Sequence, residues 1–499
     1  MRLHDLPRRF GLGPGPADAA FGWRLLLAVL AIYAVAFAAF YPRAATNDDE
    51  ARYVQQASLF LEGVTSLERV HPLTGERIAY WPSRYPVGTS AALLPFVWAG
   101  GSGGAFLLPA LSLVLGVVFT ARWLREEGRS PAAALLVFGF PSCLVLGRVA
   151  MSDVPSLAIV ALGLWLFWRG QDRGLPCWLA SGFLAGASMC FRESNALPFA
   201  PFFAGALLRR DKGWWALLVG GLVGVGLRLF SSWLVFGDPL YAKESYKFEP
   251  ETVLERLPLY ALGLLVFVPG GLLAALAYRG RRWPELRIAV GLFVGLYLLQ
   301  THSTAETGLP KRLILALRYL IPVLPLLAFA AAEVVPRQWA RALSALSERA
   351  QRRREGIAGA ALALWIAGLA AAGAGVHAFL DRWGAAQARI GEALERHIEP
   401  DKVLLTNLPA TLKFLDPRLR PFQPLSRFEV TPDDAARLAE RHGDYYIAFL
   451  DRSDSAWWRT DREQNAEFLA RLGLPLSLEL DLQATPTDRL RIWRVRAQP

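Results

Sequence analysis

The sequence predicts an all-α polytopic membrane protein with about eleven transmembrane helices, additional juxtamembrane helices and a small C-terminal α/β domain. The chain has 499 residues, of which 54% are hydrophobic, with 17 tryptophans, and this composition is too apolar for an ordinary soluble enzyme. Apolar runs of about 17 to 25 residues, the length that crosses a bilayer, recur along the chain. After residue 376 the composition changes to that of a soluble domain.

The apolar runs give the order of the predicted spans, some of them short enough to need a surrounding bundle. They lie near 23–41, 105–123, 132–149, 154–168, 177–191, 195–208, 214–236, 257–278, 286–301, 313–335 and 356–376.

Charge fixes the predicted orientation of these spans. The net charge of +11 could suggest a nucleic-acid partner, but basic residues in a membrane protein usually mark cytoplasmic loops, so no nucleic acid is expected. With residues 1–22 in the cytoplasm, the basic loops between spans fall on the cytoplasmic side. They contain Arg122, Arg125, Arg129, Arg169, Arg173, Arg209, Arg210, Lys212, Arg279, Arg281, Arg282, Arg349, Arg352, Arg353 and Arg354.

This orientation divides the chain into a transmembrane domain, residues 23–376, and a periplasmic domain, residues 377–499. The first outer loop is then 42–104, and the apolar stretch 86–101 within it contains Pro95 and is short for a span. Counting it as a span would place every later basic loop outside. It is therefore predicted to be a juxtamembrane or re-entrant helix, which is tolerated where protein or water covers it.

The C-terminal domain shows strand and helix patterns in turn. Buried strands are expected at 401–407 and 444–451, amphipathic helices ending at glycine at 433–443 and 463–473, and alternating strands at 476–482 and 489–496. These patterns predict a small α/β domain.

Three consecutive acidic residues, Asp48, Asp49 and Glu50, follow the first span in "TNDDEARYVQQASLF", residues 46–60. One interpretation is the acidic first turn of a solvated helix. The other is a catalytic site, because carboxylates at a bilayer edge lose solvation and are often functional. The residues after them place an apolar stripe at helical spacing, so the acids begin a helix lying along the interface. The stripe consists of Ala51, Val54, Ala57, Ser58 and Leu61.

Acidic and basic residues recur at two later outer turns. "GRVAMSDVPSL" contains Arg148 and Asp153, and "CFRESNALPF" contains Arg192 and Glu193. The acids therefore gather at the predicted outer ends of the spans.

In these motifs the chain resembles the GT-C glycosyltransferases, polytopic enzymes that take sugars from polyprenyl-phosphate carriers and include protein O-mannosyltransferases and lipid A aminoarabinose transferases. The matching motifs are "DEARY" (49–53), "SRYPVG" (83–88), the Arg148 to Asp153 turn and "RYLIPVLP" (318–325). The resemblance covers about residues 20–335. The aminoarabinose transferases have Glu-Lys-Pro where this chain has "SRYP", so the specific sugar and acceptor are not implied.

The resemblance implies an inverting transfer of sugar from a polyprenyl-phosphate donor to an acceptor hydroxyl on the periplasmic side of a bacterial inner membrane. The partners would be this donor, a glycan, lipid or protein acceptor, and membrane lipids. Such a transfer needs a base for the hydroxyl proton and cations for the departing phosphate. Asp49 is the expected base, with Asp48 and Glu50 as close alternatives and Asp153 in support.

Other candidates are assigned by charge or by motif. The donor phosphate candidates are Arg84, Lys243, Lys311, Arg312, Arg318 and Tyr319. The further site candidates are Arg52, Tyr53, Arg148, Arg192, Glu193 and His302. No cofactor is certain, although the acidic residues offer the oxygen ligands that Mg²⁺ or Mn²⁺ prefers.

Two other classes of function remain as alternatives. A transporter or flippase would place ionisable residues near the middle of the bilayer, in helices broken at corresponding points of two related halves, whereas here the acids lie at span ends. A non-catalytic lipid-binding or assembly protein would use the same scaffold without Asp49.

Overall fold

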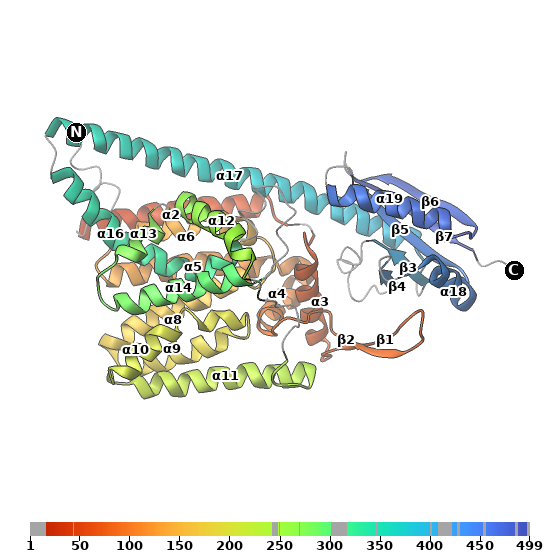
Figure 1. Ribbon diagram of the computed structural model, residues 1–499, viewed down its shortest axis with the longest axis horizontal. Coiled ribbons are helices and arrows are strands. Elements are labelled where there is room, and N and C mark those ends of the chain that lie inside the picture. The colour runs from red at the N-terminus through yellow and green to blue at the C-terminus, as the bar shows by residue number, and fades with distance from the viewer. Residues whose placement is uncertain are drawn as a thin grey trace. The chain divides into compact units, whose positions relative to one another are not determined.

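The computed structural model of the chain describes residues 16–42, 44–241, 248, 250–268, 270–300, 317–344, 348–399, 402–407, 422–426, 430–452, 456–484 and 488–496. Over these residues the protein is mostly helical, with one two-stranded hairpin and one five-stranded sheet (Figure 1). The chain divides into two compact units. The first consists of Met1–Tyr41, Arg84–Ala92 and Phe106–His377, and the second of Pro42–Ser83, Leu93–Ala105 and Ala378–Pro499.

The first unit is a helical bundle with a continuous apolar core. Trp123 stacks on Phe329 with ring centroids 4.1 Å apart, and Trp168 packs against both rings. Its elements are α2 (Pro16–Ala39), α5 (Leu107–Glu126), η2 (Pro131–Ala134), α6 (Leu135–Phe138), α7 (Pro141–Leu146), α8 (Asp153–Arg173), α9 (Leu175–Ser188), η3 (Glu193–Ala196), α10 (Ala200–Leu208), α11 (Trp214–Phe236), α12 (Thr252–Phe267), α13 (Gly271–Ala277), α14 (Trp283–Leu299), η4 (Arg318–Val323) and α16 (Leu324–Ser344). Helix α4 (Gly88–Gly104) and the long α17 (Glu348–His397) each belong partly to both units.

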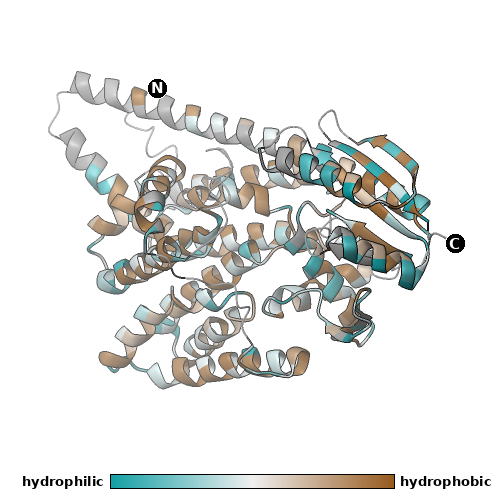
Figure 2. Ribbon diagram, turned by 45° about the vertical axis from the view of Figure 1, so that its right-hand side comes forward, coloured by the Kyte–Doolittle hydropathy of each residue, from teal (hydrophilic) through white to brown (hydrophobic). Residues whose placement is uncertain are grey.

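The first unit has the composition of a membrane protein. Among the described residues, four helices are long and apolar enough to cross a membrane, and the bent pair α12 and α13 could supply a fifth span. Figure 2 shows hydrophobic residues along most of the bundle helices. On α11 large apolar side chains face outward, including Leu222 and Trp233, which are 63% and 55% exposed. The predicted count of eleven spans stays a prediction.

Two predicted spans are not continuous helices. The segment 132–149 is divided into η2, α6 and α7, with breaks at Gly139 and before Pro141. The segment 257–278 is divided into α12 and α13, which meet at 96°. In 132–149, Pro141 lacks a backbone donor and displaces Phe140 from the helical conformation. In 257–278, α12 ends at its C-cap Val268, whose φ and ψ are −124° and 70°, and α13 begins after Gly270, which has a left-handed conformation with φ 73°. Both segments are helical and apolar as predicted, but neither forms the single unbroken helix that a span would suggest. The predicted span 195–208 likewise begins as the 3₁₀ turn η3 and becomes α-helical at Ala200.

Helices α9 and α11 pack through glycine. A Cβ added to Gly182 on α9 would lie 2.2 Å from the carbonyl oxygen of Leu217, and one added to Gly224 on α11 would lie 2.3 Å from that of Phe183. Gly182 and Gly186, and likewise Gly220 and Gly224, are spaced as in the small-xxx-small patterns that allow close approach of helices in membranes. These glycines therefore set the distance between the two helices.

We expect Gly224→Ala to lower the stability of the detergent-solubilised protein by about 1 to 3 kcal/mol, because its methyl group meets backbone of α9 that cannot move aside cheaply. Gly226→Ala is the matched control, since a Cβ at Gly226 meets no atom within 4 Å and alanine favours the helix. Thermal unfolding of both variants measures the difference. Equal stability would contradict close packing of α9 on α11.

The second unit contains a three-layered α/β domain. Its sheet consists of β3 (Lys402–Thr406), β4 (Phe422–Ser426), β5 (Tyr445–Arg452), β6 (Leu476–Gln483) and β7 (Asp488–Val495). Their order is β4-β3-β5-β7-β6, with β3 parallel to β4 and β5, and β7 antiparallel to β5 and β6. The end of α17 packs on one face, and α18 (Pro432–His442) and α19 (Ala456–Arg471) pack on the other.

The central strand β5 shows why this sheet forms. Tyr446, Ala448 and Leu450 join the core under α17, whereas Ile447 and Phe449 join the core on the opposite face. A strand buried on both faces needs this continuous apolar run. The predicted strands and both helices in this domain are confirmed, while β4 is an element that the sequence patterns did not indicate.

The second unit also contains the predicted outer-loop helix, α3 (Asp48–Leu61), and an unpredicted hairpin of β1 (Leu67–Val70) and β2 (Arg77–Tyr80). Most of the apolar stripe on α3 is buried, including Ala57, but Leu61 is 40% exposed because it lies at the helix end. The hairpin turn is held by α18: Arg441 Nη1 donates to the Leu73 carbonyl and His442 Nε2 to the Pro72 carbonyl, both at 2.7 Å. The predicted helix at 86–101 is present as α4, with a kink at Gly100 and Gly101.

Candidate functional site

The three acidic residues of the opening motif have different surroundings at the start of α3. Asn47 is the N-cap, and its side-chain oxygen accepts the backbone N–H of Glu50 at 3.0 Å. Glu50 is fully buried, and its Oε2 accepts the N–H of Thr46 at 2.6 Å and the Thr46 hydroxyl at 3.2 Å. Asn47 thus satisfies one of the backbone donors that a helix start leaves unpaired, and Glu50 binds the residue before the cap.

The other residues of this motif are arranged around that cap. Asp49 and Arg52 are half-buried, and Tyr53 is buried. The backbone of Asp48 is described, but its side chain lies outside the described part of the structure. The cap bonds of Asn47 and Glu50 do not involve the Asp49 carboxylate.

A second group of predicted residues meets at the N-terminal end of α8. Asp153 is the first residue of α8, and its side chain is fully buried. The guanidinium of Arg192 lies 3.0 Å from Asp153 Oδ1 and donates through Nε to the Ser152 hydroxyl at 2.9 Å. A carboxylate removed from water needs such a charged partner. Arg192, identified from the "RES" turn, is that partner.

The loop carrying Arg192 is held by a buried amide. Asn195 is fully buried, and its Nδ2 donates to the Ser156 hydroxyl of α8 at 2.8 Å and to the Ser188 carbonyl of α9 at 3.1 Å. These two bonds join η3 to both neighbouring helices. They fix the backbone from which the Arg192 side chain reaches Asp153.

The late "RY" motif belongs to the same cluster. Element η4 packs against α8, and Arg318 Nη2 donates to the Tyr319 hydroxyl at 3.0 Å. The Arg192 guanidinium lies over the Tyr319 ring, 5.0 Å from its centroid. The Arg318 guanidinium also lies over the Tyr319 ring, 4.9 Å from its centroid. Three separate sequence motifs are therefore brought together in one largely buried polar cluster, Asp153, Arg192, Arg318 and Tyr319, of which Asp153 is fully buried and the other three are half-buried.

This cluster has unused hydrogen-bonding capacity. Among the described residues, neither Asp153 Oδ2 nor Arg318 Nε, both buried, has a hydrogen-bond partner. Buried polar atoms in native proteins are nearly always paired. The two guanidinium groups and one carboxylate carry a combined charge of +1, so the cluster is suited to an anion that uses the free donor.

The sequence patterns missed Tyr297 and Ser194 as members of this region. Tyr297 stacks on Tyr319 with ring centroids 4.9 Å apart, and its hydroxyl shares a 2.6 Å hydrogen bond with the Ser194 hydroxyl. The available signal was a single tyrosine near the end of an otherwise apolar span, "GLYLLQ", which sequence alone cannot distinguish from an interfacial anchor.

Two other predicted residues lie in ion pairs or bonds apart from this cluster. Glu193 pairs with the buried Arg228 of α11 at 2.9 Å, and Arg228 also donates to the Tyr241 carbonyl. Arg148 donates to the carbonyl oxygens of Phe40 at 2.7 Å and His377 at 3.0 Å. Arg148 thus joins the end of α2 to α17.

The remaining predicted residues have less definite surroundings. Arg84 is exposed. Lys243, His302, Lys311 and Arg312 lie outside the described residues. Within the described part of the chain, no three histidine, cysteine or acidic side chains are grouped so that they could hold a metal ion.

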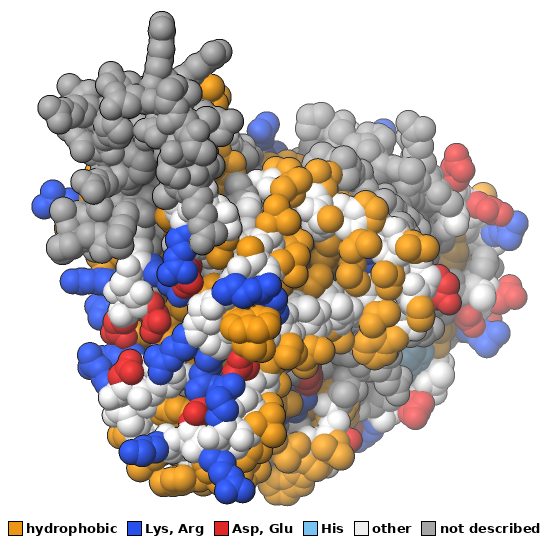
Figure 3. Space-filling view, turned by 60° about the vertical axis from the view of Figure 1, so that its left-hand side comes forward, with side chains coloured by type: hydrophobic (Ala, Val, Ile, Leu, Met, Phe, Trp, Pro, Cys, Tyr) orange, Lys and Arg blue, Asp and Glu red, His pale blue; other side chains and the backbone are white. Residues whose placement is uncertain are grey.

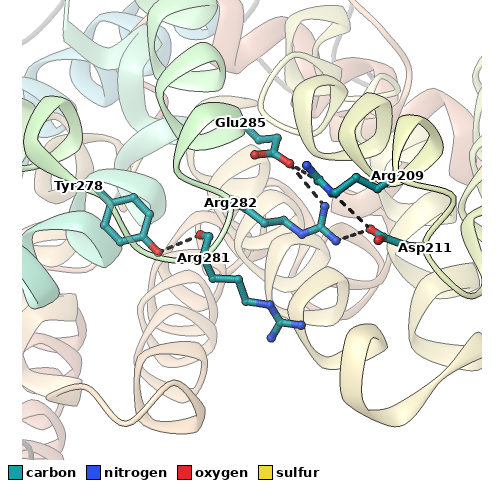
Figure 4. Close-up of polar contacts among 6 residues, drawn as sticks. All are labelled: Arg209, Asp211, Tyr278, Arg281, Arg282 and Glu285. Atoms are coloured by element: carbon teal, nitrogen blue, oxygen red, sulfur yellow. Dashed lines mark hydrogen bonds and ion pairs between the residues drawn. The ribbon is translucent and has the colours of Figure 1, made fainter.

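A second ion network lies between the turn after α10 and the start of α14 and is shown in Figure 4. Arg282 pairs with Asp211 and lies 3.4 Å from Glu285, which also pairs with Arg209. The Tyr278 hydroxyl donates to the Arg281 carbonyl at 2.9 Å nearby. In this network two arginines face two carboxylates, so the charges balance and join the turn after α10 to the start of α14.

The overall fold agrees with the GT-C fold that the motif resemblance predicted. The chain is similar to ArnT from Cupriavidus metallidurans solved with bound undecaprenyl phosphate, at 18% identity and a TM-score of 0.61, covering 95% of this chain and 98% of that chain. It is also similar to ArnT from the same organism in the apo state, at 17% identity and a TM-score of 0.60, covering 95% of this chain and 98% of that chain. No protein-family model and no curated protein matches the sequence.

Proposed function

We propose that this protein is a membrane glycosyltransferase that moves a sugar from a polyprenyl-phosphate-linked donor to an acceptor hydroxyl. The main support is the shared fold with a structure solved with undecaprenyl phosphate, extending over 95% of the chain. The largely buried cluster of Asp153, Arg192 and Arg318 adds chemical support, because its surplus positive charge suits a lipid phosphate.

In this proposal arginines hold the donor phosphate. A guanidinium stays charged at every working pH and matches phosphate oxygens with paired donors. Arg318 has a buried Nε without a partner among the described residues, and the guanidinium groups of Arg318 and Arg192 both lie over the Tyr319 ring. Arg84, Lys243, Lys311 and Arg312 are further phosphate candidates by charge alone.

The transfer is proposed as one displacement at the anomeric carbon. The acceptor oxygen forms a bond to that carbon while its proton passes to the carboxylate of Asp49. The bond between the anomeric carbon and the phosphate oxygen breaks, and the electron pair leaves with the polyprenyl phosphate. A single base with no covalent intermediate gives inversion, and the cations stabilise the charge that develops on the phosphate.

We expect Arg318→Gln to weaken binding of a polyprenyl-phosphate donor by about 1.5 to 3 kcal/mol, the contribution of one charge-assisted hydrogen bond. Arg337→Gln is the control, because Arg337 lies on the helix that follows η4, is exposed and pairs with Glu333 at 2.7 Å. Native mass spectrometry of protein titrated with the lipid measures both affinities. Equal donor affinity in the two variants would refute the phosphate role of Arg318.

The transporter or flippase alternative predicts a different result in detergent. A transporter moves its substrate between compartments, and protein in detergent micelles has no compartments to move it between. A transferase makes a new glycosidic bond, which can form in detergent. Purified protein is incubated with a radiolabelled polyprenyl-phosphate sugar and a membrane extract that supplies glycan, lipid and protein acceptors. Radiolabel covalently joined to an acceptor supports the transferase, and its absence favours the transporter or the non-catalytic lipid-binding protein.

Repeating the reaction with EDTA and then with added Mg²⁺ or Mn²⁺ tests whether the transfer needs a divalent metal.

The proposed location is the bacterial inner membrane, with the N-terminus in the cytoplasm and the C-terminal domain in the periplasm. The basic residues between spans motivate this orientation. We expect reporter fusions after residues 210 and 450 to report opposite sides of the membrane. Fusions that both report one side would contradict the proposed topology.

A further inference from the structure

A groove lies between α2 and α5, away from the Asp153 cluster. Its volume is about 620 Å³, and it is lined by Trp23, Leu27, Val118, Arg122, Arg125 and Glu126. At this end of the bundle Glu126 accepts a hydrogen bond from Trp165 of α8 at 2.8 Å. Trp165 comes 12 residues after Asp153 on α8, which corresponds to about 18 Å along the helix axis. The groove is therefore separate from the proposed donor site.

The lining of this groove changes in character along both helices. On α5, Val118, Arg122 and Arg125 follow one another at helical spacing, so an apolar side chain is followed by two cations on one face. On α2, Trp23 comes near the start of the apolar segment and Leu27 one turn further into it. The two helices together form a surface with cations at the bundle end and apolar side chains toward the middle.

The two arginines of the groove are available to a ligand. Arg122 and Arg125 are exposed, and neither forms an ion pair with another described residue. Glu126 is the one acidic lining residue, and Arg169 lies 3.5 Å from its carboxylate. Figure 3 shows lysine and arginine side chains gathered at one end of the face that it presents, beside hydrophobic side chains. The groove itself therefore keeps a surplus of positive charge.

We propose that this groove binds an anionic glycerophospholipid, with its phosphate on Arg122 and Arg125 and an acyl chain along Leu27 and Val118. Basic pockets between transmembrane helices recognise such headgroups. Trp23 suits the boundary between headgroup and chain, where tryptophan is enriched. A free phosphate would use only the cationic end of the groove, and a neutral lipid would leave both arginines without a counter-charge.

Native mass spectrometry of the detergent-purified protein tests this proposal with phosphatidylglycerol and phosphatidylcholine as probes. We expect the wild type to bind phosphatidylglycerol more tightly than phosphatidylcholine. The double variant R122Q/R125Q should bind it about 30-fold more weakly, because each arginine near an anionic lipid contributes about fivefold. R122K/R125K keeps the charge and should retain most of the binding.

The matched control is R173Q/K212Q, which removes the same charge from exposed residues that do not line the groove. Phosphatidylglycerol affinity within twofold of wild type in this control, with the loss in R122Q/R125Q, supports the site. An equal loss in both double variants, or no loss in either, would overturn it. Glycerol phosphate added as a competitor should not displace the lipid, and full displacement would show a phosphate site in place of a lipid groove.

Discussion

Asp49→Asn is expected to lower sugar transfer by about 10² to 10⁴-fold, the usual effect of removing a positioned base, while the protein stays folded and still binds donor. Asparagine has nearly the same shape as aspartate but cannot accept the proton of the acceptor hydroxyl. The cap bonds at the helix start join Asn47 to Glu50 and Glu50 to Thr46, and Asp49→Asn leaves these three residues unchanged. Turnover and thermal unfolding are measured on the same preparation.

Glu50→Gln is the informative comparison, because Glu50 is fully buried and bonded to Thr46. We expect this variant to lose about 1 to 3 kcal/mol of stability, the typical cost of disturbing a buried hydrogen-bonded group. Asp48→Asn is compared with Asp49→Asn as the same substitution at the adjacent acidic residue. If Asp49→Asn turns over near the wild-type rate, or loses activity only because it unfolds, the acidic motif is a helix start and not a catalytic site.

Arg192→Gln is expected to destabilise the protein by about 3 to 5 kcal/mol, because it leaves the Asp153 carboxylate buried without its charged partner. The side chain of Asp153 is fully buried and lies 3.0 Å from Arg192. The same substitution should also weaken donor binding, since it removes one of the two guanidinium groups from the cluster. Denaturant or thermal unfolding in detergent and donor titration measure the two effects separately.

The double variant Asp153→Asn/Arg192→Gln separates stability from binding. Removing both charges should recover much of the stability lost in Arg192→Gln, because the buried carboxylate at position 153 that lacked its charged partner is no longer present. Donor binding should stay weak, since the guanidinium is still absent. A double variant less stable than Arg192→Gln would contradict the ion pair, and normal donor binding in it would contradict the phosphate role of Arg192.

The sequence predicted elements well where local composition decides them. The strand predicted at 444–451 is apolar from Tyr445 to Leu450 and occurs as β5, Tyr445–Arg452, in the centre of the sheet. Span 154–168 occurs within α8. The prediction of one continuous helix over 132–149 was wrong. Apolar content shows that this segment favours the membrane, but Gly139 and Pro141 determine where the helix is interrupted. Strand β4 escaped prediction because Phe422–Ser426 has neither strict alternation nor a long apolar run.

The candidate site could be predicted residue by residue but not as an arrangement. Asp153, Arg192 and Arg318 each belong to a short motif, yet their meeting depends on packing of η4 against α8 and on the bonds of Asn195. Sequence spacing contains no information on such contacts. The same limit applies to Arg148: the motif places it before Asp153, whereas its bonds reach Phe40 and His377.

The most direct test of the proposed function is to follow donor and product together in detergent. Purified wild-type protein is incubated with a radiolabelled polyprenyl-phosphate sugar and membrane extract, and both glycosylated acceptor and free polyprenyl phosphate are quantified over time. We predict that the two products appear in equal amounts with wild type, whereas Asp49→Asn retains bound donor and releases neither. Release of free sugar without glycosylated acceptor, or unchanged donor in the wild-type reaction, would contradict a glycosyltransferase.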